Sequence, residues 1–408
     1  MKLLTVDTID KAREKIWEKV KSRSPETETV SLDKAGNRIL AEDIFVSCDI
    51  PGFRRSTVDG YALLAADTAG AGEAIPVFLK QTGTVFMGKP AEFSIRAGDC
   101  AYVPTGAMIP CGADAVSMLE FCESAGENIA VYEAVAPGTG IAELGEDIRC
   151  GELLLRKGAR LRPQETGLLA AAGITSVKVF SPLKISLIST GDELVSPGEN
   201  PAPGKIRDIN TQVLGALAVN RGYSLVSTCL LPDDKDALEA AVREALVTSD
   251  VVALSGGSSH VEKDVTAAVI NSAAKPGVFT HGLALKPGKP TILGWDEDSR
   301  TLLAGLPGHP VSAMVVFQLI FGWINDKLFD LEPPLPIPAK LSTNIPGSPG
   351  RTLCQPVILK QEGCEYFAEP VFGKSGMITT LTNAKGYIII DLNREGLKKG
   401  EPVLVHLL

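Results

Sequence analysis

Between residues 183 and 330 short apolar runs alternate with helical patterns, and this alternation constrains the fold more than any other feature of the sequence. The apolar runs are of strand length and cover 184–190, 223–231, 250–255 and 301–306. Helical patterns follow them at about 210–220 and 236–246, from about Lys263, and from Val311. Strands that alternate with helices form a parallel sheet with right-handed crossover connections. The block therefore predicts an α/β domain with a parallel sheet.

The rest of the chain reads as two helices and two β-rich regions. Apolar residues at helical spacing predict a helix from Thr8 to about Lys21. Short apolar runs broken by Gly and Pro indicate a β-rich unit over about 46–136. A strand, a turn and a helix follow at 153–173, with Pro163 in the first turn of the helix. After a proline-dense linker at 331–338, strand-like sequence continues to the C-terminus, where we expect a small β-domain.

Charge and composition exclude several classes of protein. Asp and Glu number 49 against 40 Lys and Arg, a formal net charge of −9. Nucleic-acid binding needs clustered Lys and Arg, so we expect no nucleic-acid partner, and an anionic substrate must bind at a local basic site. The eight cysteines include no C-x-x-C pair, which favours free thiols in a reducing compartment.

The sequence also predicts a cytoplasmic protein without a membrane partner. Asp7, Asp10 and Glu14 precede any apolar run, which is unlike a signal peptide. The longest apolar stretch, Val311 to Ile324, is shorter than the roughly 20 residues that a membrane span needs.

Polar residues gather where the predicted parallel strands end, which is the edge where open α/β sheets bind ligands. These residues are Asp192, Glu193, Asp233, Asp234, Gly256, Gly257, Ser258 and Ser259, and Asp264 follows shortly after. Converging carboxylates suit Mg²⁺, which takes hard oxygen ligands alongside phosphate. Acids after a strand also cap the next helix, so each single carboxylate remains open to that structural interpretation.

Three turns are candidate anion sites. The Gly256–Ser259 segment offers backbone N–H groups before a helix, which suits a phosphate, although a glycine pair also makes an ordinary tight turn. The turn Lys286-Pro287-Gly288-Lys289-Pro290 carries two cations between stiffening prolines, which favours an oxyanion site over a solvated basic turn. The loop from Leu306 to Ser312 presents N–H donors and a hydroxyl.

Common catalytic motifs are absent from the sequence. The four histidines form no H-x-x-x-H or H-E-x-x-H pair, which argues against zinc chemistry, and His309 reads as a turn residue rather than a base. No G-x-S-x-G nucleophile elbow, G-x-G-x-x-G dinucleotide motif or P-loop occurs.

Eight longer segments occur in a recognisable order. They are FRRSTVDGYAL (53–63), VPTGAMIPCGADAV (103–116), GEDI (145–148), STGDEL (189–194), GGSSHVEKD (256–264), KPGKP (286–290), AGLPGHPVSA (304–313) and SGMITTL (375–381). Together they resemble the molybdopterin molybdotransferase family, which includes bacterial MoeA and the E domain of gephyrin. The resemblance runs from the first helix to the C-terminus.

The resemblance implies a multidomain fold and a homodimer. The expected parts are an elongated N-terminal dimerisation domain of 1–48 with 140–180, an inserted β-rich domain at 49–139, a MogA-like three-layer α/β domain at 181–330 that binds molybdopterin, and a small C-terminal β-barrel at 331–408.

It also implies the last step of molybdenum cofactor biosynthesis, the Mg²⁺-dependent insertion of molybdate into adenylylated molybdopterin with release of AMP. The upstream adenylyltransferase is then a further expected partner. Tungstate has the same size and charge as molybdate, so the sequence does not separate the two.

The family's site residues carry over position by position. Glu193 and Asp264 match the acids that hold Mg²⁺, and Gly256, Gly257 and Ser258 match the loop on the phosphate side. Those on the molybdate side are Lys286, Lys289, Ser312 and Ser375. The remaining site residues are Asp59, Asp147 and Asp234, expected in the catalytic set, and Thr105 and Pro307, expected to bind the cofactor.

The chain departs from the family pattern at five positions. Family members commonly have an acid at Arg54, Val at Ser258, Gly at Val261, Asn at His309, and a second Arg at Gln355, four residues after Arg351. Gln355 removes an anion contact, and Val261 and His309 alter two loops of the expected site.

Two other functions share part of this pattern. A non-catalytic paralogue would bind or carry the molybdenum cofactor, but the acids and lysines of the expected site are all present. A generic Mg²⁺-dependent nucleotide hydrolase would share the acids and would not need the KPGKP turn.

Overall fold

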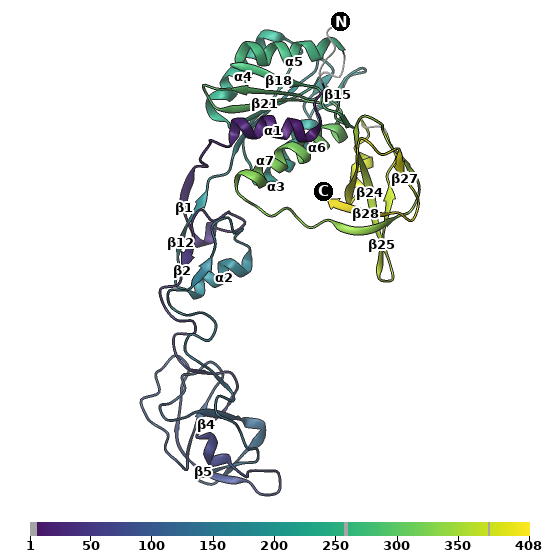
Figure 1. The fold of residues 1–408 in the computed structure, drawn as a ribbon. Helices are drawn as coiled ribbons and strands as arrows, with labels where there is room; N and C mark the ends of the chain where they lie inside the picture. The colour runs from purple at the N-terminus through teal and green to yellow at the C-terminus, as the bar shows by residue number, and fades with distance from the viewer. Residues whose placement is uncertain (1–5, 257–259, 374–375) are drawn as a thin grey trace. The chain divides into compact units, whose positions relative to one another are not determined.

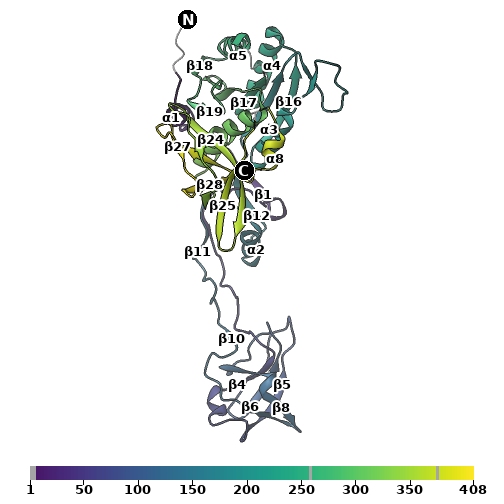
Figure 2. The same cartoon turned by 90° about the vertical axis from the view of Figure 1, so that its right-hand side faces the viewer.

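The chain divides into two units in the computed structural model, which describes residues 6–256, 260–373 and 376–408. The larger unit joins Met1–Thr27 to Phe180–Leu408, and the smaller unit is Glu28–Val179. Figures 1 and 2 show the elements of both units in two views.

A six-stranded sheet forms the centre of the larger unit, in the order β16-β13-β17-β21-β20-β18. Its strands are β13 (Lys184–Thr190), β16 (Ser224–Leu231), β17 (Val251–Gly256), β18 (Pro276–His281), β20 (Ile292–Asp296) and β21 (Thr301–Leu306). Strands β16, β13, β17 and β21 run parallel, which confirms the expected parallel sheet.

Strands β20 and β18 extend this sheet in antiparallel fashion, and the sequence did not predict them. The turn between β20 and β21 is closed by the Asp296 carboxylate, which accepts a hydrogen bond from the Ser299 N–H at 2.8 Å. An antiparallel pair needs only such a short turn, whereas a parallel pair needs a helical crossover. The alternation of strands and helices therefore stops at this edge.

Helices cover both faces of the sheet, so this domain has three layers (Figure 1). Helices α4 (Lys235–Thr248) and α5 (His260–Ala273) lie on one face, where a buried cluster includes Ile188, Val242 and Val269. On the other face lie α1 (Ile9–Val20), α3 (Asn210–Asn220), α6 (Pro310–Phe317) and α7 (Trp323–Leu328).

Helix α1 forms where the sequence predicts it. The Thr8 hydroxyl caps it by accepting a hydrogen bond from the Lys11 N–H at 3.2 Å. Its buried face consists of Ile9, Ala12, Ile16 and Val20. The Arg13 guanidinium donates to the Leu319 carbonyl at 2.6 and 3.0 Å, in the π-helical segment Gln318–Gly322 that joins α6 to α7.

One helical run in the described part of the chain, Pro310–Leu328, is long and apolar enough to cross a membrane by length and composition. Inside the larger unit, 72% of its most apolar window is buried. The Tyr223 hydroxyl also donates to the Phe321 carbonyl at 2.7 Å. These are the properties of a core helix.

A closed five-stranded barrel forms the C-terminal region, as the sequence predicted. Its strands are β22 (Ile337–Leu341), β24 (Thr352–Glu362), β25 (Glu365–Pro370), β26 (Gly386–Ile390) and β28 (Pro402–Leu407). Strand β24 also pairs with β19 (Leu285–Lys286), which comes from the α/β domain. The C-terminal region also contains the pair β23 (Ile345–Pro346) with β27 (Gly396–Leu397) and the short helix α8 (Thr379–Thr382), and the α/β domain contains the pair β14 (Leu194–Val195) with β15 (Ile206–Arg207).

The smaller unit is mainly β-structure, which confirms the β-rich prediction. Its largest sheet has the order β7-β4-β6-β5-β9-β8. The strands are β4 (Gly60–Leu63), β5 (Val77–Thr84), β6 (Asp99–Val103), β7 (Ala115–Met118), β8 (Cys122–Ala125) and β9 (Asn128–Val131). Buried clusters that include Ala101 and Ile129 pack on this sheet.

Three strand pairs, one α-helix and the 3-10 helices Leu32–Lys34, Ala65–Thr68 and Leu119–Phe121 complete the smaller unit. The pairs are β1 (Thr27–Ser31) with β12 (Ser176–Phe180), β2 (Ile44–Phe45) with β11 (Leu153–Leu155), and β3 (Arg55–Ser56) with β10 (Ile141–Ala142). Helix α2 (Pro163–Ala171) begins at the expected proline. The four domain boundaries expected from the sequence stay a prediction.

Candidate active site

A cavity of about 310 Å³ opens at the carboxyl ends of β13 and β17, and we call it the strand-end cavity. Loop residues, strand ends and the start of α6 line it: Thr190, Glu193, Leu194, Ile206, Arg207, Asp208, Ile209, Asn210, Ser255, Gly256, Gly308, His309, Pro310 and Gly376. The sequence predicted a site at this sheet edge, and Glu193 and Gly256 are the predicted residues that the structure brings together there.

Glu193 is exposed in this cavity, directly after the end of β13. Its carboxylate lies over Gly191, where an added Cβ would come within 2.8 Å of the Glu193 Oε2 atom. Gly256 is equally restricted, because a Cβ there would meet the Thr190 carbonyl oxygen of the paired strand at 2.1 Å. The glycines of these turns therefore leave room for the carboxylate and for the close approach of β13 and β17.

The neighbouring acids take structural contacts instead. The Asp233 carboxylate accepts hydrogen bonds from the Thr190 hydroxyl at 2.7 Å and from the Asp192 N–H at 3.4 Å. Asp234 caps α4 by accepting from the Ala237 N–H at 2.8 Å. Neither Asp233 nor Asp234 lines the strand-end cavity. The assignment of Asp234 to the site stays a prediction.

Two buried polar residues of this cavity were missed from the sequence. The Asp208 carboxylate accepts from the Ser189 hydroxyl at 2.9 Å. The Asn210 amide donates to the Ser255 hydroxyl at 2.7 Å and the Gly308 carbonyl at 2.8 Å, and its buried Oδ1 atom has no partner among the described atoms. Asp208 follows the two-residue strand β15 and Asn210 begins α3, so their only sequence signal is a pair of polar residues before an apolar helix.

A second cavity of about 370 Å³ lies beside the KPGKP turn, and we call it the Lys286 cavity. It is lined by Lys286, Pro287, Val311, Ile345, Pro346, Leu353, Cys354, Gln355, Pro356, Val371, Phe372 and Gly373. Lys286 arrives there because β19 pairs with β24, which sets Lys286 opposite Leu353. Lys286 is the only charged residue among the described residues that line this cavity.

The KPGKP turn is held by its own backbone. The Leu283 N–H donates to the Lys289 carbonyl at 3.0 Å, and the Thr291 hydroxyl donates to the Gly288 carbonyl at 2.7 Å. Gly288 has a φ of 130°, and a Cβ there would lie 2.8 Å from the Leu285 side chain. Lys289 is exposed on this turn and does not line the Lys286 cavity.

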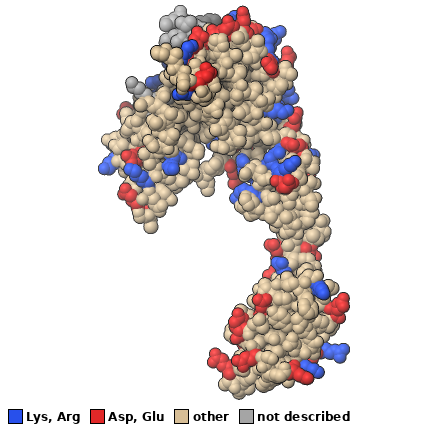
Figure 3. Space-filling view, turned by 180° about the vertical axis from the view of Figure 1, so that it is seen from behind, with Lys and Arg blue, Asp and Glu red and all other residues tan. Residues whose placement is uncertain are grey.

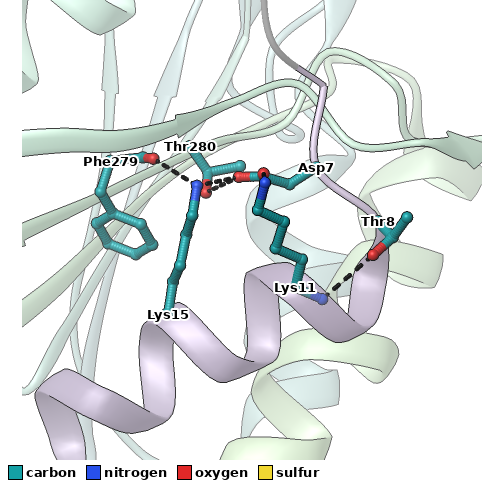
Figure 4. A network of polar contacts seen from close by, with 6 residues as sticks. All are labelled: Asp7, Thr8, Lys11, Lys15, Phe279 and Thr280. Atoms are coloured by element: carbon teal, nitrogen blue, oxygen red, sulfur yellow. Dashed lines mark hydrogen bonds and ion pairs between the residues drawn. The ribbon is translucent and has the colours of Figure 1, made fainter.

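A polar network braces the segment that leads into this turn (Figure 4). The buried Asp7 carboxylate accepts a hydrogen bond from the Thr280 hydroxyl at 2.8 Å. It also forms ion pairs with the Lys11 ammonium at 3.4 Å and with the Lys15 ammonium. The Asp7 N–H donates to the Gly282 carbonyl at 3.1 Å. Burial raises the pKa of Asp7, but the hydrogen bonds from Lys15 and Thr280 and the lysine charge outweigh it, so the pKa of Asp7 lies below its usual value.

Consecutive residues at the start of α6 line the two cavities. Gly308, His309 and Pro310 line the strand-end cavity, whereas Val311 lines the Lys286 cavity. Likewise, Val371–Gly373 line the Lys286 cavity and Gly376 lines the strand-end cavity. The two cavities therefore adjoin. Pro307, in the loop before α6, and Ser312, in the first turn of α6, are buried and are not among the lining residues of either cavity.

Several predicted residues lie outside what the structure describes. These are Gly257, Ser258 and Ser375, together with the side chain of Asp264 on α5. Their assignment to the site stays a prediction.

In the smaller unit the structure brings two predicted residues together. The Asp59 carboxylate accepts hydrogen bonds from the Thr105 N–H at 2.7 Å and the Thr105 hydroxyl at 3.1 Å. Asp147 is exposed, and its N–H donates to the Ile50 carbonyl at 3.1 Å. The Arg54 guanidinium is paired with Glu143 at 2.9 Å and also donates to the Ala113 carbonyl at 3.1 Å.

Family models match nearly the whole sequence. The MoeA N-terminal region (domain I and II) matches 7–173, a probable molybdopterin binding domain matches 186–326, and the MoeA C-terminal region (domain IV) matches 338–408. The molybdopterin molybdenumtransferase of Haemophilus influenzae is 32% identical over 404 residues, 98% of each chain. The chain belongs to the MoeA family.

Other MoeA relatives agree with this membership. The molybdopterin molybdenumtransferase of Bacillus subtilis is 33% identical over 391 residues, which is 94% of this chain and 90% of that protein. A crystal structure of the molybdopterin biosynthesis MoeA protein of Pyrococcus horikoshii OT3 superposes with a TM-score of 0.84. The two sequences are 31% identical, and the match covers 99% of this chain and 100% of that chain. The resemblance seen in the sequence is therefore confirmed for the whole MoeA-type chain.

The charge distribution of this MoeA-family protein agrees with local recognition of anions. On the face drawn in Figure 3, acidic and basic side chains are interspersed. The cationic features of the two cavities are Arg207 at the strand-end cavity and Lys286 at its neighbour.

Proposed function

We propose that this protein inserts molybdate into adenylylated molybdopterin and releases AMP. As a MoeA-family member it acts in molybdenum cofactor biosynthesis as a molybdopterin molybdenumtransferase. The observation that carries the specific reaction is the pair of adjoining cavities, because one offers carboxylate and amide oxygens and the other offers a lysine. A phosphorylated pterin and an oxyanion require such a pair of neighbouring sites.

The strand-end cavity fits a magnesium ion that is held jointly with substrate phosphate. Its donors are oxygen atoms, namely the carboxylates of Glu193 and Asp208 and the unpartnered Oδ1 atom of Asn210. No group of three His, Cys, Asp or Glu side chains in the described part of the chain is arranged to hold a metal alone. Mg²⁺ suits this set, since proteins usually hold it with one or two carboxylates plus phosphate oxygens.

We assign the Mg²⁺ ligands to Glu193 and Asp264. When bound there, the ion would supply positive charge to the phosphate groups of the substrate. Glu193 is placed for this role by Gly191, which leaves space beneath its carboxylate. Gly256, Gly257, Ser258 and Pro307 are assigned to the phosphate and pterin side of the substrate.

The oxyanion side of the site is assigned to Lys286, Lys289, Ser312 and Ser375. The exposed Lys286 ammonium at the cavity offsets charge on molybdate. Asp59, Thr105, Asp147 and Asp234 complete the proposed set of site residues.

The proposed chemical step needs no protein nucleophile. An oxygen of molybdate attacks the adenylate phosphorus, so this oxygen leaves in AMP while the bond from that phosphorus to the molybdopterin phosphate breaks. The bond between molybdenum and that oxygen then breaks as the two dithiolene sulfurs bind molybdenum, and the two thiol protons pass to the departing AMP and to a remaining oxygen of molybdate. Isotope-labelled molybdate oxygen should therefore appear in AMP, and unlabelled AMP would contradict the step.

The decisive experiment measures AMP release by the purified protein with adenylylated molybdopterin, Mg²⁺ and molybdate. Release that depends on molybdate is expected of the transferase. Release without molybdate would instead indicate a nucleotide hydrolase, and binding without release would indicate a carrier. Replacing molybdate by tungstate in the same assay tests which oxyanion the site prefers.

The remaining proposals concern assembly and location. We place the protein in the cytoplasm as a homodimer, with the upstream adenylyltransferase as the donor of its substrate. Sedimentation at micromolar concentration tests the dimer, and a monomer throughout would reject it.

A further inference from the structure

Gln355 lines the Lys286 cavity from strand β24, and it is only 9% exposed. On this strand it lies opposite Ile388 of β26, so its backbone belongs to the barrel. A polar side chain at the wall of an anion-binding cavity has two plausible uses: it either contacts the anion or holds the wall.

The hydrogen bonds of Gln355 decide between these uses. Its Nε2 atom donates to the Val371 carbonyl at 2.8 Å and to the Pro356 carbonyl at 3.1 Å. A side-chain amide nitrogen carries two hydrogens, so both donors are committed to the backbone. Gln355 therefore has no donor left for an oxyanion.

The same bonds fasten a second wall of the cavity. The Val371 N–H donates to the Pro356 carbonyl at 2.9 Å, so Val371 is tied to β24 through both its N–H and its carbonyl. Val371 opens the segment that contributes Val371–Gly373 to the Lys286 cavity and Gly376 to the strand-end cavity. The Gln355 amide thus anchors the start of Val371–Gly373, a wall of the Lys286 cavity.

We propose that Gln355 is a positioning residue that fixes this wall and thereby sets the affinity for molybdate, while Lys286 supplies the charge. The proposal rests on the proposed function, because it names molybdate as the occupant of the Lys286 cavity. Loss of the amide releases the Val371 carbonyl and leaves only the backbone bond from the Val371 N–H to β24, so Val371–Gly373 loosen and the oxyanion loses a preformed pocket although Lys286 is unchanged.

Gln355→Met tests the proposal, because Met keeps the length of the side chain and removes both donors. The matched control is Gln361→Met on the same strand, where the exposed amide bonds only the Gly363 carbonyl at 3.2 Å. We expect Gln355→Met to raise the KM for molybdate about tenfold, as for the loss of two ordinary hydrogen bonds. The KM for adenylylated molybdopterin should stay within about twofold, since Val371–Gly373 line only the Lys286 cavity. Equal changes in both KM values, or none, would overturn the proposal.

A second variant separates positioning from a general structural effect. In Gln355→Glu the ionised carboxylate faces two carbonyl oxygens, whereas the protonated acid regains one O–H donor. The KM for molybdate of Gln355→Glu should therefore approach the wild-type value as the pH falls, while that of Gln355→Met should not. Parallel pH profiles for the two variants would reject the role of the amide donors.

Hydrogen exchange tests whether Gln355 anchors residues 371–373, and it does not require an activity assay. Backbone amides of 371–373 should exchange faster in Gln355→Met than in the wild type, and at the wild-type rate in Gln361→Met. If the wild type releases no molybdate-dependent AMP, the proposed function fails while this measurement still tests the anchor. Unchanged exchange in Gln355→Met would overturn the anchor itself.

Discussion

At the scale of single residues, acids that follow a strand take one of two roles. The carboxylates of Asp233 and Asp234 accept nearby hydroxyl and backbone N–H groups, so they stabilise turns and a helix terminus. Glu193 and Asp208 line the strand-end cavity. What separates the two roles is the surrounding backbone, and this includes glycines that leave room for a carboxylate.

Gly191→Ala should lower activity without unfolding the protein. The added Cβ would lie 2.8 Å from the Glu193 Oε2 atom, and the end of a flexible side chain can move away at little cost in stability. The displaced carboxylate would no longer contact Mg²⁺. We therefore expect the Mg²⁺ concentration that gives half-maximal AMP release to rise about tenfold, which is the effect of losing roughly one charge-assisted contact. Gly198→Ala, where no atom lies within 4 Å of the new Cβ, is the control. Identical Mg²⁺ dependence in the two variants would contradict the placement of Glu193.

Asp234 allows the cap and the proposed site role to be measured separately. Asp234→Ala removes the acceptor for the Ala237 N–H and should lower the free energy of unfolding by about 1 kcal/mol. Asp234→Ser keeps a capping oxygen without the charge, so stability should return close to that of the wild type. If Asp234 also acts in the site, Asp234→Ser remains slow in AMP release. Full activity of Asp234→Ser would show that Asp234 only caps α4 and has no role in the site.

At the scale of elements, two pieces of structure carry Lys286 to its cavity. Strand β19 pairs with β24 of the barrel, and the Asp7 network ties the N-terminal segment to the residues just before β19 (Figure 4). Strand β19 itself contains Lys286, which contacts molybdate in the proposed reaction. The Asp7 network does not contact substrate and positions the segment that carries Lys286.

Asp7→Asn tests this brace through its pH dependence. At pH 7 the substitution should cost roughly 2 kcal/mol of unfolding free energy, because a buried carboxylate loses charged hydrogen-bond donors. The pKa of Asp7 is lowered in the folded protein, so its contribution is present above the unfolded value of about 3.9 and is lost as the pH falls through the folded value. The difference between variant and wild type should therefore close below about pH 4.

Urea unfolding followed by tryptophan fluorescence measures this difference at each pH. Asp10→Asn is the control on the same helix, because the Asp10 side chain is 89% exposed and lies 4.0 Å from Arg13. Such a surface pair should change stability by less than about 1 kcal/mol at any pH. A pH-independent effect of Asp7→Asn would contradict the charged network.

The sequence predicted elements well where a local pattern defines them. The strand at 301–306 and the helix at 210–220 were expected within a residue or so of their observed bounds, because their apolar patterns are complete within the segment. Strands β18 and β20 were missed because a short turn, not a helix, links β20 to β21. Strand β19 has only two residues and is defined by its partner β24, so no local pattern predicts it.

The residues of the candidate site also divide into those that a local sequence pattern predicts and those that it does not. Glu193 and Gly256 were predicted because strand ends define them, and the structure brings them into one cavity. Asp208 and Asn210 were missed because their role depends on contacts with Ser189, Ser255 and Gly308 from other elements. The role of the Gln355 amide likewise could not be predicted, because it donates to the carbonyl of Val371, which belongs to another segment.

At the scale of the whole molecule, an acidic chain handles anionic substrates. A formal net charge of −9 repels such substrates at long range, but salt screens this field over about 8 Å under physiological conditions. In the proposed reaction, recognition then depends on charges next to the substrate, foremost Lys286 in its cavity. The surplus of acids describes the surroundings, and a few placed cations define the proposed site.

The two units should unfold in separate steps, because each has cores of its own. Buried clusters built around Ala101, Leu161 and Ile129 lie wholly within the smaller unit, whereas those around Val252 and Val357 lie within the larger one. A chain with several independent cores is not expected to follow a two-state transition. Proteolysis near the boundary residues should consequently leave folded fragments.

The positions of the tryptophans make this measurable in the intact protein. All three, Trp17, Trp295 and Trp323, belong to the larger unit, so tryptophan fluorescence reports on that unit alone. Far-UV circular dichroism reports on both units. We expect the urea transition seen by circular dichroism to be broader than the fluorescence transition or to have a second step. Transitions that coincide at every urea concentration would show that the two units unfold as one.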